Sequence, residues 1–308
     1  LAAFLQVTLG GIVRVTGSGL GCPDWPLCHG RLVPPLEHTA LIEYFHRLTA
    51  SILGVLVFIS AMLSLVLHRK NKWMLISNLS GLALVIMAAV LGGITVMTEL
   101  DTWARLVHLG LAEGVVACLL IASVMGLKSV RKLSNIETTI KNTIKIKVLT
   151  MSSLLGMFIV ILFGSYMVGY GAGSACSSWP LCKGSLIPDG VPYAIHMGHR
   201  FTAAVIGILI AMTTWATWSQ RAKQKWIGPA SVALAVLFIA QIFIGAVIVW
   251  IGFDASIKSI HLSLATLVWM SLAFLAYLVY SPIDSQLSGG DNYSEDDLDL
   301  RPQNNLAV

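Results

Sequence analysis

Charged residues are the class that this sequence most clearly lacks. Only 11% of its 308 residues are Asp, Glu, Lys or Arg, against about 25% in ordinary soluble domains, whereas 56% are hydrophobic. A water-soluble fold of this length does not need so much apolar surface. The deficit therefore excludes an ordinary soluble globular domain.

The apolar residues fall into eight blocks, most of them long enough to cross a hydrocarbon layer of ~30 Å, which takes ~20 helical residues. The blocks are 1–15, 45–67, 73–97, 104–127, 148–169, 197–218, 226–250 and 257–280. They predict an all-α integral membrane protein with eight transmembrane helices. The first block is short and the sequence begins at Leu1. We therefore expect the N-terminal end of that helix to be missing, in preference to a cleaved signal peptide.

Lys and Arg are concentrated in three of the connecting segments, and loops rich in these residues stay in the cytoplasm. The twelve basic residues of these inner loops are Arg69, Lys70, Lys72, Lys128, Arg131, Lys132, Lys141, Lys145, Lys147, Arg221, Lys223 and Lys225. The outer segments hold only Arg14, Arg31, Arg47, Arg105, Lys183, Arg200 and Lys258. Both termini are therefore expected in the cytoplasm. Because topology explains the net charge of +5, nucleic-acid binding is not expected.

The sequence contains an internal repeat. CPDWPLC at 22–28 recurs as CSSWPLC at 176–182, a shift of 154, and His46-Arg47 and His108-Leu109 recur as His199-Arg200 and His261-Leu262, a shift of 153. Each copy holds four predicted spans, an even number, so both copies insert with the same orientation. We predict two tandem pseudo-symmetric four-helix bundles. The expected divisions are an N-terminal half at 1–132, a cytoplasmic linker at 133–146, a C-terminal half at 147–281 and a disordered cytoplasmic tail at 282–308.

Two histidines in each copy lie near the outer ends of predicted helices, namely His46, His108, His199 and His261. A histidine in a membrane span is costly and usually functional. One isolated histidine is often only hydrogen-bonded to a neighbouring helix, but a duplicated pair favours a binding site. Two imidazoles from facing helices are the usual axial ligands of a low-spin haem. Zinc and copper usually take three or four ligands, and the second copy offers only His196 as a third.

Four of the five cysteines lie in the two long outer loops, as Cys22 with Cys28 and Cys176 with Cys182. An oxidising compartment favours two disulfides within these loops, each stabilising by about 2 kcal/mol because the rings are small. The alternative is a redox-active dithiol that exchanges electrons with thioredoxin-like partners. Covalent haem attachment is disfavoured, because it needs a Cys-x-x-Cys-His motif. A zinc site of Cys22, Cys28, His29 and His38 is a weaker alternative, because the second loop has no matching histidines.

The two copies differ at ionisable positions. Alignment places Glu43 opposite His196, Glu113 opposite Thr266 and Arg14 opposite Val168. A duplicated site that has carboxylates in one copy suggests that this copy performs chemistry, while the other stores or relays electrons.

Glu43 precedes His46 by three residues, so both side chains share one face of a continuing helix. There it can accept a proton or stabilise developing positive charge. The alternative is a carboxylate favoured only by the helix dipole. Glu113 is either a proton relay or an ion-pair partner of Arg105 or another basic residue.

Arg47 and Arg200 follow the paired histidines in the two copies. A guanidinium group matches the carboxylate of a haem propionate, so both are candidate propionate contacts. Interfacial anchoring of their long side chains is the alternative.

A resemblance to a known family rests on three short motifs. Gly17-Ser18-Gly19 precedes Cys22, Trp-Pro-Leu-Cys occurs in both copies, and Ile42 to Arg47 reads IEYFHR. Together they resemble the bacterial haem A synthases of the cysteine-containing type, over nearly the whole chain. The resemblance implies oxidation of the C8 methyl group of haem O to a formyl group, through hydroxylated intermediates, in the plasma membrane of a bacterium.

The resemblance also implies the division of the site. A haem b cofactor is expected between His199 and His261, substrate haem O between His46 and His108, and the catalytic carboxylate at Glu43. The expected partners are a haem O synthase and a thiol-disulfide or quinone redox partner, and an oligomer is compatible with the sequence. The rival functions are a di-haem cytochrome b that only passes electrons from quinol, and a haem or quinone transport or binding module.

Overall fold

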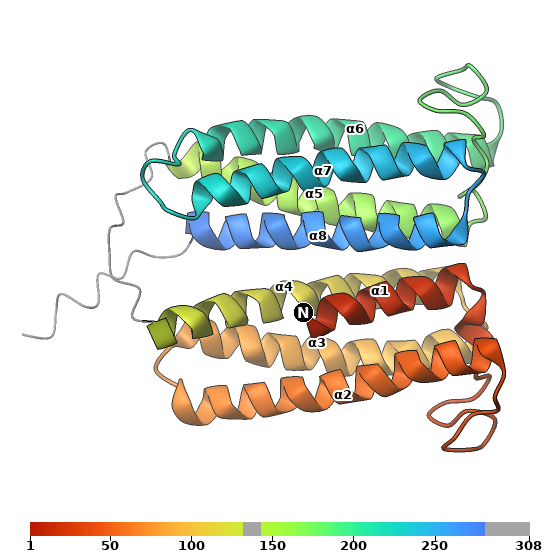
Figure 1. Ribbon diagram of the computed structural model, residues 1–308, viewed down its shortest axis with the longest axis horizontal. Coiled ribbons are helices and arrows are strands. Elements are labelled where there is room, and N and C mark those ends of the chain that lie inside the picture. Colours follow the sequence, from red (N-terminus) through yellow and green to blue (C-terminus); the bar gives the residue numbers. More distant parts are fainter. Residues whose placement is uncertain (132–142, 281–308) are drawn as a thin grey trace, which may run out of the picture.

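The computed structural model describes residues 1–131 and 143–280 (Figure 1). The expected tail and most of the expected linker lie outside the described residues. Within them the chain forms eight α-helices and one short 3-10 helix, and no β-strand. The elements are α1 (Ala2–Val15), η1 (Ser18–Leu20), α2 (His38–Leu67), α3 (Lys72–Met97), α4 (Thr102–Arg131), α5 (Thr143–Gly169), α6 (Val191–Trp218), α7 (Ile227–Trp250) and α8 (Ala255–Tyr280). The prediction of an all-α protein is confirmed for this part of the chain.

Seven of these helices, α2 to α8, are long and apolar enough to cross a membrane. The chain is therefore a multi-pass membrane protein. The helix α1 has 14 residues. At ~1.5 Å per residue it is ~21 Å long, shorter than the ~30 Å hydrocarbon layer. Of the eight expected spans, seven meet the requirements of length and composition.

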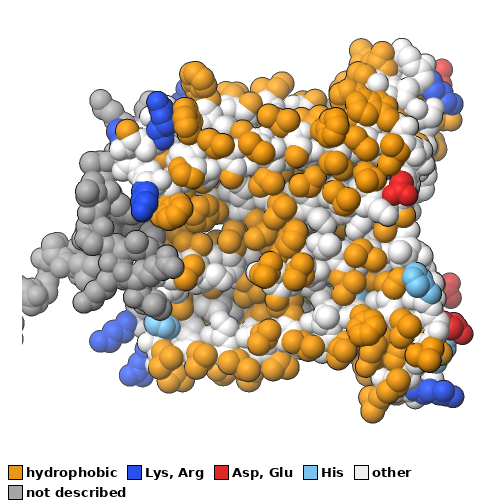
Figure 2. All heavy atoms as spheres, viewed as in Figure 1, with side chains coloured by type: hydrophobic (Ala, Val, Ile, Leu, Met, Phe, Trp, Pro, Cys, Tyr) orange, Lys and Arg blue, Asp and Glu red, His pale blue; other side chains and the backbone are white. Residues whose placement is uncertain are grey.

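Large apolar side chains cover the outer sides of the helices, as Figure 2 shows, and the charged side chains gather at the two ends of the molecule. Val66, Trp215 and Ile239 are 72%, 78% and 67% exposed. Such exposure over several helices would be unfavourable in water but matches a lipid environment.

The helices pack mainly with their neighbours in the chain, and Figure 1 shows α1 to α4 on one side and α5 to α8 on the other. Contacts between these two groups are made by α1, α4, α5 and α8. The helix α8 contacts α1, α4, α5 and α7, and is the most buried of the candidate spans. Its Val268, Leu272 and Leu275 are 0% exposed, so the core of the molecule lies along this helix.

Several helices begin earlier than the apolar blocks predict. The helices α2 and α6 start at His38 and Val191, where the apolar blocks start at 45 and 197. The first turns of these helices contain polar residues such as His38 and Glu43. A prediction based on apolar blocks therefore does not include them. The helix α5 starts at Thr143, inside the expected linker.

The two long cysteine-containing loops each contain one disulfide, Cys22–Cys28 and Cys176–Cys182, closed within its own loop. The four cysteines are between 0% and 3% exposed, so they form small cores under the loops. The first loop lies directly on the start of α2, because a Cβ at Gly21 would collide with the carbonyl group of Thr39. Only glycine permits this close approach.

One polar side chain organises the turn of each loop. The carboxylate of Asp24 accepts hydrogen bonds from the backbone N–H of His29 at 2.6 Å and of Gly30 at 2.7 Å. The hydrogen bond from Gly30, followed by that from His29, lowers the pKa of Asp24. At the matching position of the second loop, Ser178 Oγ accepts from the backbone N–H of Lys183 at 2.9 Å. The two loops thus share a shape but differ in charge.

Candidate functional site

The four predicted haem ligands lie on four different helices. His46 is on α2 and His108 on α4, and these two imidazoles are near enough to interact electrostatically. His199 on α6 and His261 on α8 have the same relationship. The structure therefore brings together the histidines that belong to the same copy of the repeat.

A glycine on a neighbouring helix faces each of these imidazole rings. A Cβ at Gly10, Gly92, Gly164 or Gly245 would lie 3.1, 3.2, 3.1 or 3.1 Å from the Cε1 atom of His46, His108, His199 or His261, respectively. A side chain at any of these positions would press on the ring. Sequence analysis overlooked the four glycines, although the first and third, and the second and fourth, are themselves related by the repeat.

Three of the four imidazoles form a hydrogen bond with a neighbouring helix. Gln6 Nε2 donates to His46 Nδ1 at 2.9 Å, and Gln241 Nε2 donates to His261 Nε2 at 3.2 Å. The third bond runs from His108 Nδ1 to the carbonyl oxygen of Ala88 at 2.9 Å. Sequence analysis missed both glutamines, although an amide inside an apolar span is itself a functional signal.

The donor set fits haem iron better than a free metal ion. The buried Nδ1 atoms of His199 and His261 have no hydrogen-bond partner within the described residues. Two imidazoles on different helices, each opposite a glycine, suit axial ligation of a haem. Among residues 1–131 and 143–280 no group of three or more His, Cys, Asp or Glu side chains is arranged to hold a metal ion. The zinc alternative does not fit, because Cys22 and Cys28 are joined in a disulfide.

Glu43 lies in α2 one turn before His46 and is only 5% exposed. Its Oε1 atom accepts a hydrogen bond from Arg47 Nε at 2.8 Å, which is also an ion pair. This contact holds one carboxylate oxygen. No hydrogen bond to the second oxygen, Oε2, is formed in the described part of the chain.

Arg47 connects this carboxylate to the first disulfide loop. Its Nη1 donates to the carbonyl oxygens of Asp24 at 2.6 Å and Leu27 at 3.0 Å, and its Nη2 to that of Cys22 at 2.8 Å. With the bond to Glu43, four of its five N–H groups are used. Arg47 therefore holds the loop in place, and its contact with a propionate stays a prediction.

Arg200 makes the matching connection in the second half. It donates to His196 Nε2 at 3.2 Å and to the carbonyl oxygens of Ser178 and Pro180 at 2.8 and 3.0 Å. His196 occupies the place of Glu43, so the arginine has an imidazole partner instead of a carboxylate. Contact of Arg200 with a propionate likewise stays a prediction.

Glu113 lies on α4 at the contact with α8, and it is 0% exposed. Its Oε1 accepts a hydrogen bond from Thr266 Oγ1 at 2.7 Å, and its backbone oxygen accepts one from Trp269 Nε1 at 2.9 Å. The buried Oε2 atom has no partner among the described residues. No ion pair with Arg105 forms within those residues, which removes that explanation of Glu113.

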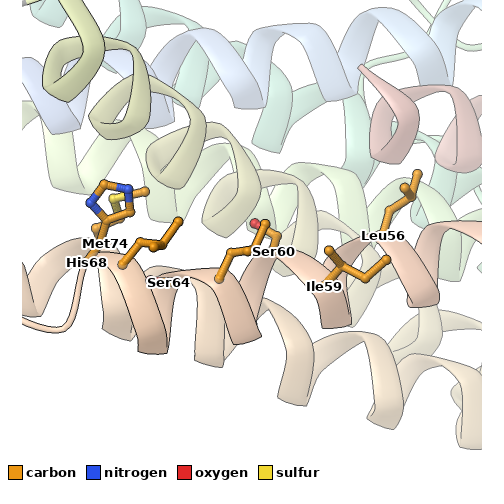
Figure 3. A pocket seen from close by; sticks show the side chains of 8 residues that line it. Leu56, Ile59, Ser60, Ser64, His68 and Met74 are labelled. Atoms are coloured by element: carbon orange, nitrogen blue, oxygen red, sulfur yellow. The ribbon is translucent and has the colours of Figure 1, made fainter.

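A surface groove lies away from all of these residues. It has a volume of about 390 Å³ and is lined by the second half of α2 and the start of α3, including Ser60, Ser64, His68 and Met74 (Figure 3). None of the paired histidines lines it. The groove is therefore separate from the paired histidines.

Comparisons with known proteins relate this chain to one group of membrane enzymes. Residues 1–273 match the model of the COX15-CtaA family, described as cytochrome oxidase assembly protein. The chain is 27% identical over 285 residues to heme A synthase of Exiguobacterium sp. (strain ATCC BAA-1283 / AT1b), covering 91% of this chain and 90% of that protein. It is 27% identical over 281 residues to heme A synthase of Geobacillus thermodenitrificans, covering 90% and 88%. It is 28% identical over 290 residues to heme A synthase of Shouchella clausii (strain KSM-K16), covering 91% and 94%.

Proposed function

This chain belongs to the COX15-CtaA family of cytochrome oxidase assembly proteins, and from that premise we propose that it oxidises the C8 methyl group of haem O to the formyl group of haem A. Its place in haem A biosynthesis for terminal oxidases follows from the family and from its haem A synthase relatives. The observation that carries the specific reaction is the unequal pair of sites. Both have two histidines, but only the first has a buried carboxylate one helical turn away.

The two halves are proposed to be tandem pseudo-symmetric four-helix bundles with different duties. In the second, His199 and His261 would hold a resident haem b, which when bound supplies electron transfer. Their unpartnered buried nitrogens and the facing glycines support this assignment. In the first, His46 and His108 would receive haem O as substrate.

Glu43 is the proposed catalytic residue. Arg47 fixes its Oε1 atom, so the carboxylate cannot rotate freely. The other oxygen is left to take up a proton released at the methyl carbon, or to stabilise positive charge that develops there. Burial in a low-dielectric interior strengthens both effects. His196 at the same place in the second half lacks the negative charge for the second role.

The rival proposal is a di-haem cytochrome b that passes electrons from quinol to a partner. Such a protein needs a histidine pair in each half but no carboxylate that belongs to one half alone. The location of Glu43 against Arg47, beside one pair only, favours the enzyme over the electron carrier.

The proposed orientation has both termini in the cytoplasm and the disulfide loops outside, in the plasma membrane of a bacterium. The proposed partners are a haem O synthase that delivers substrate and a thiol-disulfide or quinone redox partner that removes electrons.

The deciding experiment separates cofactor from chemistry. Full-length protein is purified in detergent, its haems are extracted and identified by mass, and conversion of haem O is measured. Glu43→Gln keeps the size and an oxygen for Arg47 but removes the charge, so conversion should fall by about 10²-fold or more while haem b content stays normal. The matched control is His196→Gln, which should affect conversion far less.

Histidine variants complete the test. His199→Ala or His261→Ala should lower the haem b that co-purifies, whereas His46→Ala should lower only bound haem O. Normal conversion by Glu43→Gln would contradict the catalytic role. Two equivalents of haem b, with no haem O, haem A or hydroxylated haem, would support the electron carrier instead.

A further inference from the structure

Two arginines near the predicted substrate site lack a counter-charge. Arg14 lies in the last turn of α1, and Arg105 lies in the first turn of α4. They are close enough for their positive charges to repel each other. In the part of the chain that the structure describes, neither forms an ion pair.

Both guanidinium groups also have unused donors in the interior. The Nε atoms of Arg14 and Arg105 are buried without a hydrogen-bond partner among the described residues. Arg14 is fixed by Ser165 of α5, whose Oγ and carbonyl oxygen accept from Nη1 at 3.1 Å and Nη2 at 2.7 Å. Arg105 has a longer bond of 3.4 Å from Nη2 to Thr102 Oγ1. Buried donors without acceptors, beside a like charge, are unfavourable unless an anion completes them.

The arginines lie on the outer side of the first histidine pair. Arg105 precedes His108 by three residues, so the two share a face of α4. Gly10 faces the ring of His46, and Arg14 follows it by four residues on the same face of α1. Both residues therefore lie about one helical turn along their helices from the layer of the imidazoles, towards the disulfide loops.

We propose that Arg14 and Arg105 form a two-guanidinium site for the two propionate carboxylates of the haem that enters the first half. The proposal rests on the proposed function, because it assigns the acidic edge of the same substrate. Each planar guanidinium offers paired N–H groups that match a carboxylate, and the two positive charges match the two negative charges. The haem would thus be oriented with its propionates towards the outer surface.

The two arginines occur in the first half alone, although Ser165 of the second half holds the Arg14 side chain. The matching positions in the second half are Val168 and Lys258, and the ammonium group of Lys258 lies 5.7 Å from the centre of the Phe253 ring. One apolar residue and one ammonium group do not reproduce the pair. The anion site would therefore orient the haem of the first half by contacts that the second half does not reproduce.

The test compares binding of a haem with and without its carboxylates. Iron protoporphyrin IX and its dimethyl ester are each titrated into full-length protein that already holds haem b, and binding is followed by absorbance. Subtraction of the absorbance change measured with the His46→Ala variant leaves the part of the signal that is due to binding in the first half. In the unmodified protein the diacid should bind at least about tenfold more tightly than the diester, as expected when charge-assisted hydrogen bonds to carboxylates are lost.

Arg14→Gln and Arg105→Gln should each weaken binding of the diacid by about tenfold and leave binding of the diester unchanged. The ratio of the two affinities is measured within each variant, so partial loss of folded protein does not affect it. Arg105→Lys keeps the charge without the planar fork. Its ratio of diacid to diester affinity should lie between those of the unmodified protein and of Arg105→Gln. Arg31→Gln, in the exposed part of the first loop, is the matched control and should keep the original ratio.

Unchanged ratios in both glutamine variants would overturn the proposal, as would equal weakening of diacid and diester. The latter would point to a structural role or to a lipid phosphate at the arginines. If His46→Ala binds the diacid as well as the unmodified protein does, the substrate site itself is misplaced and the proposed function fails on separate grounds.

Discussion

Thr266 donates a hydrogen bond of 2.7 Å to Glu113, and these two residues occupy the same position in the two copies of the repeat. They meet where α8 contacts α4, so the contact joins equivalent points of the two halves. Glu113 was open to two explanations from sequence alone, and the ion pair with Arg105 is wrong for the described residues. Its bond to Thr266 gives it a role at the contact between halves.

We predict that Thr266→Val lowers the free energy of unfolding by about 0.6 to 1.7 kcal/mol, the range of interhelical hydrogen bonds in membrane proteins. Glu113→Gln retains an acceptor oxygen and should cost less than Glu113→Ala. Unfolding in detergent measures both. In the Glu113→Ala background, Thr266→Val should have no further effect, and additive costs would show that the two residues are not coupled.

The glycines that face the histidines give a second prediction. Gly164→Ala and Gly245→Ala would place a methyl group 3.1 Å from the imidazoles of His199 and His261. The rings must then shift, and overpacking of about 1.4 kcal/mol weakens haem b binding about tenfold. Pigment analysis of purified protein checks this. Gly54→Ala, where the nearest atom is 3.7 Å away, should bind haem b normally.

The first loop should respond to acid, and the second should not. Because the folded loop lowers the pKa of Asp24, its stabilising effect is complete above the unfolded value of about 3.9 and is lost as the pH falls through the lower folded value. Hydrogen exchange at His29 and Gly30, corrected for intrinsic rates, should accelerate below about pH 4. Asp24→Asn should remove this dependence. Ser178 is uncharged, so equal acceleration in the second loop would contradict the explanation.

The orientation can be tested with single cysteines in a Cys118→Ala background. An impermeant thiol reagent added outside intact cells should label Leu36→Cys in the first disulfide loop, since Leu36 is 89% exposed. It should not label Lys70→Cys between α2 and α3, which is expected in the cytoplasm. The reverse pattern would invert the proposed topology.

Arg47 and Arg200 provide matched loop variants. Arg47→Lys loses the planar fork that reaches Asp24, Leu27 and Cys22, so the first disulfide should become easier to reduce. Arg200→Lys should have the same effect on Cys176–Cys182 only. Alkylation and peptide mapping after brief exposure to reductant measure both. Equal exposure of the two disulfides in each variant would contradict a local role for the arginines.

Much of the fold followed from composition, because hydrocarbon thickness sets a length that apolar runs reveal directly. The predicted ends at 67, 97, 169, 218 and 250 coincide with the ends of α2, α3, α5, α6 and α7. Helix starts were less well predicted. A helix such as α2 begins with polar turns before its apolar block. These turns are helical because of their backbone hydrogen bonds, and side-chain hydropathy does not reveal them.

The candidate site was likewise predictable only in part. The repeat predicted which histidines lie together, because the two histidines of one copy are expected to form one site and the other copy repeats the arrangement. It did not predict that Gln6 and Gln241 contact these histidines, since neither glutamine is repeated in the other copy. The bonds of Arg47 to loop carbonyls were also beyond sequence analysis, because backbone acceptors are the same at every residue and only the folded loop brings three of them to one guanidinium group.

The position of Arg47 has a mechanical consequence. One planar group holds both the carbonyls of the first disulfide loop and the carboxylate of Glu43, so a single side chain connects the loop to the carboxylate. A partner that opened Cys22–Cys28 would loosen the support of a buried acid without touching it. The redox state of the loop would then change the freedom of a single buried side chain.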